Sequence, residues 1–521
     1  MNIIRSEFPE PSNYSEIKCV DDIGKILNEY SDFLTDESRL DASSVEKIYF
    51  PISSLQVSAI LQELNKNSKK IAVSGARTGV VGGAVALDVD CLISLSKMKK
   101  FLTVNDNSLA VQAGVSLDEL NAFIVDNCPE KFFPVDPTET SASMGGCVST
   151  NASGARTYHY GPTRDWVNSI TIVFLDGSMT RIKRGTIFAD KCCFRMQFPN
   201  RPESRFEFPL HSYPETKNTA GFILTEKMDA IDLFIGSEGI LGIITEVEIR
   251  LIPKPENRLY TVVWLPDEKQ AINLVSKIKE SNRLEILALE YFDKHSIEIL
   301  KKRRNQEGNS SSIPHLDFKA NAAVFFDCIY ADENELIEIS AEFSSILSNQ
   351  NLSLDDTWSG LDDSDLRRMK ALRHALPETI NMIIAERKKQ CPDLHKISTD
   401  FAVPNDSLNE MLDIYHRAMK KASLEYVIFG HIGNNHLHMN ILPKNATELK
   451  LAKELYIELA FEAVRLGGTV SAEHGIGRLK RHLMPVQYPP EMINAMRTLK
   501  NIFDPKGLLN PGVLLPESNV S

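Results

Sequence analysis

The sequence has no apolar run long enough to cross a membrane and no pair of cysteines spaced as C-x-x-C. A membrane-spanning helix needs about 18 or more consecutive apolar residues, and ferredoxin-type iron–sulfur clusters need closely spaced cysteines. The N-terminal stretch Met1 to Glu7 is polar and lacks the apolar core of a signal peptide. We therefore expect a cytoplasmic protein without a cluster of its own, with peripheral attachment to a membrane as an alternative.

Basic charge is also scarce, because 58 lysines and arginines face 70 aspartates and glutamates, a net charge of −12. Binding to nucleic acid relies on basic groups that neutralise phosphates, so this balance argues against a nucleic-acid partner. The eight cysteines are scattered along the chain, which fits a reducing compartment. The 521 residues, 43% of them hydrophobic, suffice for two or three globular domains.

Three glycine-rich segments lie in the first half of the chain, at residues 74–83, 136–156 and 235–245. The first follows a strand-like run and places four glycines within nine residues, which lets backbone amides converge on phosphate oxygens. It has neither the Gly-Lys-Ser/Thr of a Walker loop nor G-x-G-x-x-G spacing. Each loop alone has a purely structural explanation. Together they indicate one extended cofactor spread across all three.

The pattern of apolar residues predicts several elements around these segments. Ser116 and Glu119 form a capping box that opens a helix through Asn127. We further expect helices at 17–33 and 54–67, a surface loop at 190–220, and strands at 259–265 and 322–330 with a helix at 267–281. The last three predict an antiparallel sheet covered by helices on one face.

A cluster of histidines lies near the C-terminus. If Asn434 and Asn435 form a two-residue turn, His431 lies directly across a hairpin from His438. Cross-strand partners have Cβ atoms about 5 Å apart, close enough to share a metal ion. With Glu473 they provide two imidazoles and a carboxylate, a ligand set suited to zinc with one position open. A cluster of surface histidines without a metal is the alternative.

These motifs follow one another along nearly the whole chain, and a segment at 503–512, Phe-Asp-Pro-Lys-Gly-Leu-Leu-Asn-Pro-Gly, ends the series. Together they resemble the FAD-linked 2-hydroxyacid dehydrogenases, which include D-lactate and D-2-hydroxyglutarate dehydrogenases and the flavin subunit of glycolate oxidase, within the vanillyl-alcohol oxidase superfamily. The resemblance implies an α+β fold. A two-subdomain FAD-binding domain would span residues 1–255, an α+β cap domain with an antiparallel sheet would bind substrate in residues 256–465, and residues 466–521 would return to the FAD domain.

The resemblance also implies which residues bind FAD. The pyrophosphate would contact Gly75, Arg77, Thr78, Gly79, Gly82 and Gly83. The flavin and its ribityl chain would contact Thr138, Gly145, Gly146, Asn151 and Ser153, and the adenine end would contact Glu238, Gly239 and Ile244. Asn510 would lie near the isoalloxazine ring.

By the same resemblance His431, His438 and Glu473 bind a divalent metal, for which we expect zinc, with manganese or iron as alternatives. His474 is the implied base, and Arg373 and Lys396 match residues that hold the substrate carboxylate. The implied reaction oxidises a D-2-hydroxy acid such as D-lactate to the 2-oxo acid. The metal lowers the hydroxyl pKa, and hydride passes to flavin N5.

The implied partners are the small acid and an external electron acceptor, which would be a quinone, a cytochrome or an electron-transfer flavoprotein. A homodimer and peripheral membrane contact are further expectations. Three other functions stay open at this point: a non-redox flavoenzyme of the alkyl-dihydroxyacetonephosphate synthase type, a metal-dependent hydrolase with purely structural glycine loops, and a flavin-containing electron-transfer or scaffold subunit. The pattern of residues does not name the acid.

Overall fold

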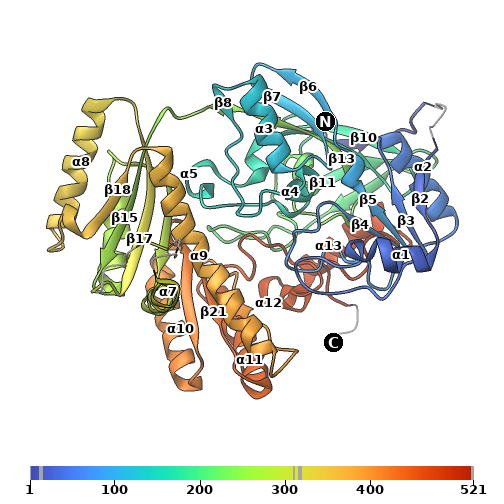
Figure 1. The fold of residues 1–521 in the computed structure, drawn as a ribbon. Coiled ribbons are helices and arrows are strands. Elements are labelled where there is room, and N and C mark those ends of the chain that lie inside the picture. The colour runs from blue at the N-terminus through green and yellow to red at the C-terminus, as the bar shows by residue number, and fades with distance from the viewer. Residues whose placement is uncertain (1, 11–15, 309–310, 312, 315–318, 518–521) are drawn as a thin grey trace.

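The computed structural model describes residues 2–10, 16–308, 311, 313–314 and 319–517 (Figure 1). Its first sheet has the order β2-β3-β5-β4, with β3, β5 and β4 parallel and β2 antiparallel to β3. The four strands are β2 (Lys18–Val20), β3 (Lys47–Phe50), β4 (Ile71–Ser74) and β5 (Cys91–Ser94). The first glycine-rich loop therefore begins where β4 ends.

Of the two helices predicted near the N-terminus, the structure contains one as predicted and the other only in part. Helix α2 (Ser54–Lys66) confirms the prediction, and it buries Val57, Ile60 and Leu61. The helix expected at 17–33 is wrong in its first part, because residues 18–20 pair with β3 as strand β2, and α1 (Ile23–Glu29) and a 3₁₀ turn at Ser31–Phe33 follow that strand. Pairing with a neighbouring strand has here overridden a local helical pattern.

A second sheet of five antiparallel strands has the order β10-β9-β13-β7-β6. Its strands are β6 (Phe101–Asn105), β7 (Ser108–Gln112), β9 (Val167–Val173), β10 (Met179–Lys183) and β13 (Ile243–Arg250). Helix α3 (Leu117–Asn127) carries the predicted capping box, since Ser116 and Glu119 exchange both hydrogen bonds. Shorter elements complete this region: α4 (Met144–Thr150), α5 (Thr157–Tyr160), β8 (Lys131–Phe132) and β14 (Ile252–Pro253).

The expectation of a surface loop at 190–220 is wrong for residues 193–197 and 204–207, which form strands. Strands β11 (Cys193–Gln197) and β12 (Ser204–Glu207) form a third sheet with β1 (Ile3–Arg5). Phe194 and Phe206 are fully buried. The composition of this segment predicted a loop because the local sequence does not show that its phenylalanines pack against distant parts of the chain.

The largest sheet has seven strands in the order β18-β15-β17-β16-β20-β21-β19, with every neighbouring pair antiparallel. The strands are β15 (Asn257–Leu265), β16 (Glu285–Phe292), β17 (Ala322–Tyr330), β18 (Thr357–Gly360), β19 (Ile397–Ser398), β20 (Tyr426–His431) and β21 (His436–Ile441). This sheet and its helices lie on the left in Figure 1. The predicted strands and the helix at 267–281, observed as α6 (Glu268–Glu280), are confirmed.

Helices cover both faces of this sheet rather than the one face expected. Alternate residues of β15 enter different cores: Val263 packs with α6 and α8 (Glu333–Ser348), and Val262 packs with α7 (Lys294–Glu307) and α9 (Asp363–Lys388). Every residue of β15 from Leu259 to Leu265 is buried. A strand buried on both faces reads as a continuous apolar run, so its pattern alone does not report how many faces are covered.

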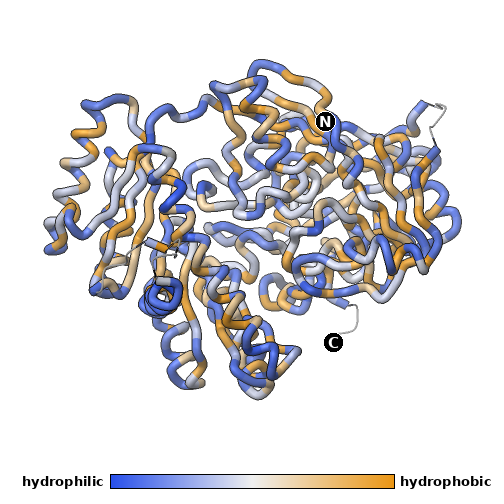
Figure 2. The backbone as a smooth tube through the Cα atoms, viewed as in Figure 1, coloured by the Kyte–Doolittle hydropathy of each residue, from blue (hydrophilic) through white to orange (hydrophobic). Residues whose placement is uncertain are grey.

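The remaining helices are α10 (Leu408–Ala422), α11 (Ala446–Arg465), α12 (Met484–Gln487) and α13 (Pro490–Phe503). Beyond α13 the chain returns to the first sheet, where the amide of Asn510 donates to the carbonyl of Ile71 at 2.8 Å. Hydrophobic residues are concentrated in the inner strands and hydrophilic residues on the outer helical turns (Figure 2). In the part of the chain that the structure describes, every helix is too short or too polar to span a bilayer.

One ion pair between α10 and α6 provides a test of stability against pH. Nε2 of His416 lies 2.9 Å from Oε1 of Glu268, and this hydrogen bond raises the pKa of His416 above its ordinary value of 6.5. The stabilisation is therefore fully present below about pH 6.5 and is lost as the pH rises through the higher pKa of the folded state. We expect the His416→Gln variant to lie closest to wild type in unfolding free energy at alkaline pH, measured by urea denaturation. A stability difference that does not shrink as the pH rises contradicts this assignment.

Candidate active site

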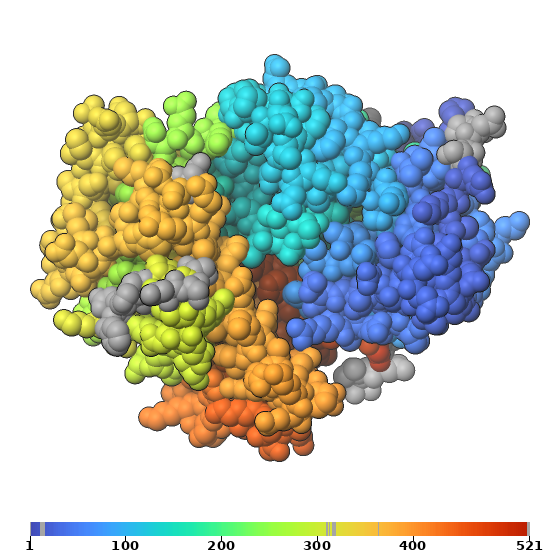
Figure 3. All heavy atoms as spheres, in the orientation of Figure 1, coloured from blue at the N-terminus to red at the C-terminus, as the bar shows by residue number. Residues whose placement is uncertain are grey.

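A cavity of about 380 Å³ lies between the glycine-rich loops and the histidine hairpin. In Figure 3 the surface is hollowed between the yellow-orange and the blue-cyan parts of the chain, and dark red residues of the C-terminal segment are visible at the bottom. Most of the residues predicted to bind cofactor line this cavity: Gly75, Arg77, Thr78, Gly79, Gly83, Thr138, Gly145, Gly146, Ser153, Glu238, Gly239, Ile244 and Asn510. The three glycine-rich loops are thus brought together in one site.

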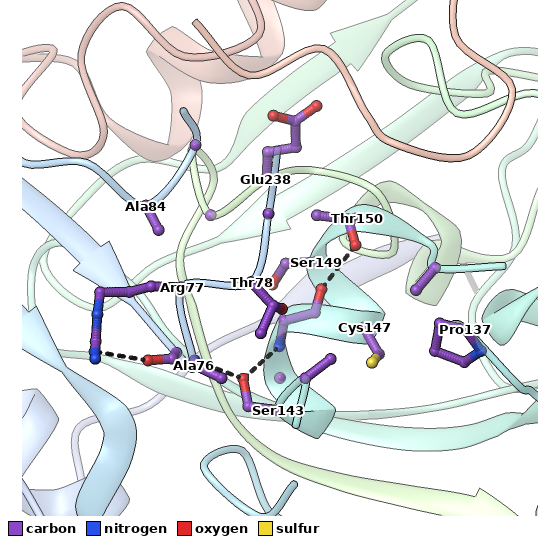
Figure 4. A pocket seen from close by; sticks show the side chains of 18 of the residues that line it. Ala76, Arg77, Thr78, Ala84, Pro137, Ser143, Cys147, Ser149, Thr150 and Glu238 are labelled. Atoms are coloured by element: carbon purple, nitrogen blue, oxygen red, sulfur yellow. Dashed lines mark hydrogen bonds between the residues drawn. The ribbon is translucent and has the colours of Figure 1, made fainter. Parts of the chain in front are cut away.

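The first loop presents unpaired backbone donors to this cavity. The amide of Ala76 donates to Oγ of Ser143 at 3.3 Å, which joins the loop to the start of α4 (Figure 4). Among the residues that the structure describes, the amides of Arg77, Thr78 and Gly79 have no acceptor. Converging free amides form a nest that attracts anions, such as the oxygens of a pyrophosphate.

Two predicted cofactor residues lie outside the lining of the cavity. Gly82 has φ +76°, in the left-handed region that residues other than glycine rarely adopt. Asn151 ends α4 in the left-handed region, and its Oδ1 accepts from the amide of Arg164 at 2.9 Å. Direct contact of these two residues with a cofactor stays a prediction.

The second loop packs closely against neighbouring backbone at two of its glycines and carries an unpaired hydroxyl. A Cβ on Gly145 would lie 2.6 Å from Cβ of Ala113, and one on Gly154 would lie 2.1 Å from the carbonyl oxygen of Asp136. Oγ of Ser153 is buried, lines the cavity and has no hydrogen-bond partner among the described residues. Buried hydroxyls are normally paired, so this orphan points to a polar ligand in the cavity.

These contacts predict different effects for two glycine substitutions in the same cavity. We expect Gly154→Ala to lower the free energy of unfolding by about 1–3 kcal/mol, because the added methyl group collides with backbone. Gly79→Ala is the matched control, since a Cβ there has no atom within 4 Å and faces open space. Its stability should stay within about 0.5 kcal/mol of wild type in denaturant titrations of the cofactor-free protein. Equal losses in both variants would contradict the packing argument.

Glu238 connects the third loop to the C-terminal segment. Its two carboxylate oxygens accept from the amides of Ile476 and Gly477, each at 2.7 Å. Its carbonyl accepts from Nδ2 of Asn510 at 3.0 Å, and Oδ1 of Asn510 accepts from the amide of Val73. Burial raises the pKa of Glu238 to about 7. Glu238 and Asn510 thereby bring loops that are far apart in the chain to one wall of the cavity.

The register of the histidine hairpin differs from the prediction. His431 pairs with His436, and His438 pairs with Phe429. The expected two-residue turn is wrong because four residues, 432–435, connect the strands through a 3₁₀ turn that ends with Asn435 in the left-handed region at φ +51°. The rings of His431 and His438 nevertheless meet, with centroids 5.7 Å apart.

Three histidines and one carboxylate converge at this hairpin. His431, His436, His438 and Glu473 each offer a ligand atom, and these atoms all lie within 4.8 Å of one another. Nε2 of His431 lies 3.3 Å from one oxygen of Glu473, and Nε2 of His438 lies 3.2 Å from the other. Tetrahedral zinc with ligand bonds of about 2.0–2.1 Å separates its ligands by roughly 3.3 Å, so this donor set fits such an ion.

The other nitrogen of each of these two rings is held by an oxygen. Nδ1 of His431 lies 2.6 Å from Oε1 of Glu290, and Nδ1 of His438 lies 3.0 Å from the carbonyl oxygen of Thr399. When a ring carries one proton, on Nδ1, its Nε2 lone pair is directed at Glu473, although in the absence of a metal Glu290 and Glu473 raise the pKa of His431 to about 9. Hydrogen bonds of this kind set the tautomer and orientation of metal-binding histidines.

A third carboxylate, Asp400, contacts the other side of the cluster. Its oxygens lie 3.0 Å from Nε2 of His436 and 3.5 Å from Nδ1 of His474, and they accept from Nζ of Lys480 at 2.6 Å. The amides of Glu473 and His474 also donate to it. Burial lowers the pKa of His436 to about 3 and that of His474 to about 4, so both rings are neutral near pH 7. His474 lines the cavity and is able to accept a proton there.

The two predicted substrate residues lie outside the lining of the main cavity. Nη1 of Arg373, on α9, lies 3.9 Å from Oε1 of Glu290, and its side chain borders a smaller neighbouring cavity. Lys396 immediately precedes β19, and burial lowers its pKa. The structure brings Arg373 beside Glu290, which contacts His431, and the roles of Arg373 and Lys396 stay predictions.

Three residues of the site were missed from the sequence: Lys217, Glu290 and Asp400. Nζ of Lys217 lies 2.5 Å from Oε2 of Glu473, although residues 190–220 were expected to form a surface loop. Glu290 is in the middle of the large sheet, and Asp400 follows β19. No local motif marks them, because only the tertiary fold brings them to the histidines.

Comparison with known proteins agrees with this geometry. The model of the FAD-binding domain matches residues 45–183, and the model of the C-terminal domain of FAD-linked oxidases matches residues 254–514. The chain belongs to the FAD-linked oxidases. It is therefore an FAD-linked oxidoreductase, and the lining of the cavity fits FAD through its free amides and its orphan hydroxyl.

Two relatives of this FAD-linked oxidase align over almost their full length. The chain is 27% identical to the D-lactate dehydrogenase of Anaerostipes hadrus, over 94% of this chain and 93% of that one. It is also 27% identical to the D-2-hydroxyglutarate dehydrogenase of Stutzerimonas stutzeri, over 96% and 98%. These names identify what the relatives do.

Two solved structures share its fold. The 4-ethylphenol oxidase of Gulosibacter chungangensis, in complex with isoeugenol, aligns with a TM-score of 0.64 and 15% identity over 96% of this chain and 94% of that one. An alkyldihydroxyacetonephosphate synthase aligns with a TM-score of 0.60 and 17% identity over 90% and 77%. The likeness confirms the predicted α+β fold of the vanillyl-alcohol oxidase type.

Proposed function

We propose that this FAD-linked oxidase converts a D-2-hydroxy acid resembling D-lactate to the 2-oxo acid and depends on a divalent metal. The observation that carries the proposal is the single cavity that joins the cofactor loops to His431, Glu473 and His474. The names of the aligned dehydrogenases of D-lactate and D-2-hydroxyglutarate support the same class of substrate.

In this proposal residues 1–255 bind FAD, residues 256–465 form the cap and residues 466–521 complete the FAD site. His431, His438 and Glu473 would hold the metal, which we expect to be zinc. When bound, the two groups supply hydride acceptance by the flavin and acidification of the substrate hydroxyl by the metal. The protein would supply position, charge and a base.

The residues of this chain would carry out the remaining steps. Nε2 of His474 would take the hydroxyl proton, which its neutral, buried ring is suited to accept. The planar guanidinium of Arg373 and the ammonium of Lys396 would hold the substrate carboxylate and so orient its α-carbon. Electrons would then leave to a quinone, a cytochrome or an electron-transfer flavoprotein.

Anaerobic mixing of the FAD-loaded protein with a panel of D-2-hydroxy acids tests the proposal. Flavin absorbance should bleach with at least one acid, and prior treatment with a chelator should abolish bleaching until zinc is restored. The L-enantiomer of the active acid is the matched control. Protein that retains FAD but is bleached by none of the acids would contradict the proposal, and so would bleaching that a chelator leaves unchanged.

A further inference from the structure

A buried lysine forms an ion pair with the carboxylate at the centre of the histidine cluster. Nζ of Lys217 lies 2.5 Å from Oε2 of Glu473, closer than Nε2 of His431, which lies 3.3 Å from the same oxygen. The lysine side chain is only 3% exposed, and that of Glu473 is 11% exposed. Buried lysines are rare, so this contact needs a reason.

The backbone around Lys217 is fastened to the segment that carries Glu473. The amide of Thr219 donates to the carbonyl oxygen of Ser471 at 2.8 Å, and Oγ1 of Thr219 accepts from the amide of Gly475 at 3.1 Å. Oδ1 of Asn218 accepts from Oγ1 of Thr469 at 2.7 Å. The lysine therefore approaches Glu473 as part of a rigid junction.

Two carboxylates lie on either side of the His431 ring. The side chains of Glu290 and Glu473 are 6% and 11% exposed, and they lie against opposite nitrogens of that ring. Nη1 of Arg373 lies 3.9 Å from Glu290, and Nζ of Lys217 lies against Glu473. A buried carboxylate without a compensating cation is costly, so the pair of carboxylates requires positive charge close by.

An ammonium and a divalent metal compete for this position. Both would contact Glu473, and like charges a few ångströms apart inside a protein repel by several kcal/mol. A carboxylate oxygen that accepts from an ammonium donates less strongly to a metal, and the ammonium also repels the ion. The contact of Lys217 with Oε2 of Glu473 therefore opposes binding of the metal.

We propose that Lys217 is the built-in counter-cation of the metal-free cluster and competes with the divalent metal for Glu473. The lysine keeps the carboxylates stable and assembled before metal arrives, and it lowers the affinity of the finished site for the metal. The inference rests on the proposed metal role of His431, His438 and Glu473, and it assigns Lys217 as a positioning residue of that cluster.

Zinc titration of the FAD-loaded, chelator-stripped protein tests this competition. We expect Lys217→Gln and Lys217→Met to bind zinc at least about tenfold more tightly than wild type in isothermal titration calorimetry, because the opposing charge is gone. Both variants should lower the thermal midpoint of the metal-free protein, and zinc should raise their thermal midpoint by more than it raises that of wild type. Lys217→Arg, which keeps the charge, should bind zinc with an affinity close to that of wild type.

Lys500→Gln is the matched control, because the Lys500 side chain is only 12% exposed and forms an ion pair with Asp504 at 2.5 Å outside the histidine cluster. It should leave zinc affinity unchanged even if it lowers stability.

The inference is overturned if both neutral Lys217 variants bind zinc no more tightly than wild type. The proposed metal site still stands in that case if wild type binds zinc and His438→Ala abolishes the binding. If neither wild type nor the Lys217 variants bind zinc, the metal site and the competition both fail. Zinc binding by the variants alone supports the competition in its strongest form.

Discussion

Replacing His438 by alanine is expected to lower kcat/KM for the D-2-hydroxy acid by roughly 10³-fold while FAD stays bound. Loss of a metal ligand removes several kcal/mol of charge stabilisation at the substrate hydroxyl, and each 1.4 kcal/mol corresponds to about a tenfold change in rate. His438 is preferred to His431 for this substitution. Nδ1 of His438 contacts a carbonyl oxygen, whereas Nδ1 of His431 contacts the buried carboxylate of Glu290. Stopped-flow flavin reduction under anaerobic conditions measures the loss.

His295→Ala is the matched control for this substitution. His295 lies on α7 with a side chain 44% exposed, and it contacts Glu298 on the same helix and the ring of Tyr426, away from the histidine cluster. We expect its flavin reduction and zinc content to equal those of wild type. Zinc content that is unchanged in His438→Ala would refute the assignment of His438 as a ligand, whatever happens to the rate.

The second large effect is expected for His474→Gln, which should lower kcat by about 10²–10⁴-fold, the usual contribution of a general base. The ring lies 3.5 Å from both Asp400 and Glu473, and burial keeps it neutral, so it is ready to accept a proton. Glutamine preserves the volume but is not a base at neutral pH. Single-turnover flavin reduction should slow while FAD absorbance and zinc content stay at wild-type levels.

His482→Gln is the matched control here, because His482 is an exposed histidine in the same C-terminal segment that does not line the cavity. It should reduce flavin at the wild-type rate. If His474→Gln also loses zinc, the residue supports the metal rather than moving a proton. If it reduces flavin within about twofold of wild type, another group is the base.

Elements with strong local signals were predictable from the sequence. The capping box at Ser116 satisfies orphan amides by itself, so α3 begins where the pattern places it. The glycine loops were recognisable because close backbone packing excludes a Cβ, as at Gly145 and Gly154. Strand β2 and the strands at 193–207 were misread because pairing with strands elsewhere in the chain, β3 and β1, contributed to their conformation.

The residues of the candidate site were likewise predictable only in part. His431, His438, Glu473 and His474 stood out by residue type and order, but the register that joins them depends on a four-residue connection whose length local sequence did not indicate. Lys217 was placed on the surface by composition and is buried against Glu473.

By itself the sequence determined the chemistry available to this protein: acidic overall charge, three glycine-rich loops for one extended cofactor, and a donor set suited to a divalent metal. Local hydrogen bonding and the absence of a Cβ act over a few residues, so such features can be read directly. Only the tertiary structure decided which charges face one another, namely Glu290 behind His431, Asp400 behind His474 and Lys217 on Glu473. Electrostatic balance in a buried site is set by residues hundreds of positions apart, and only folding brings them together.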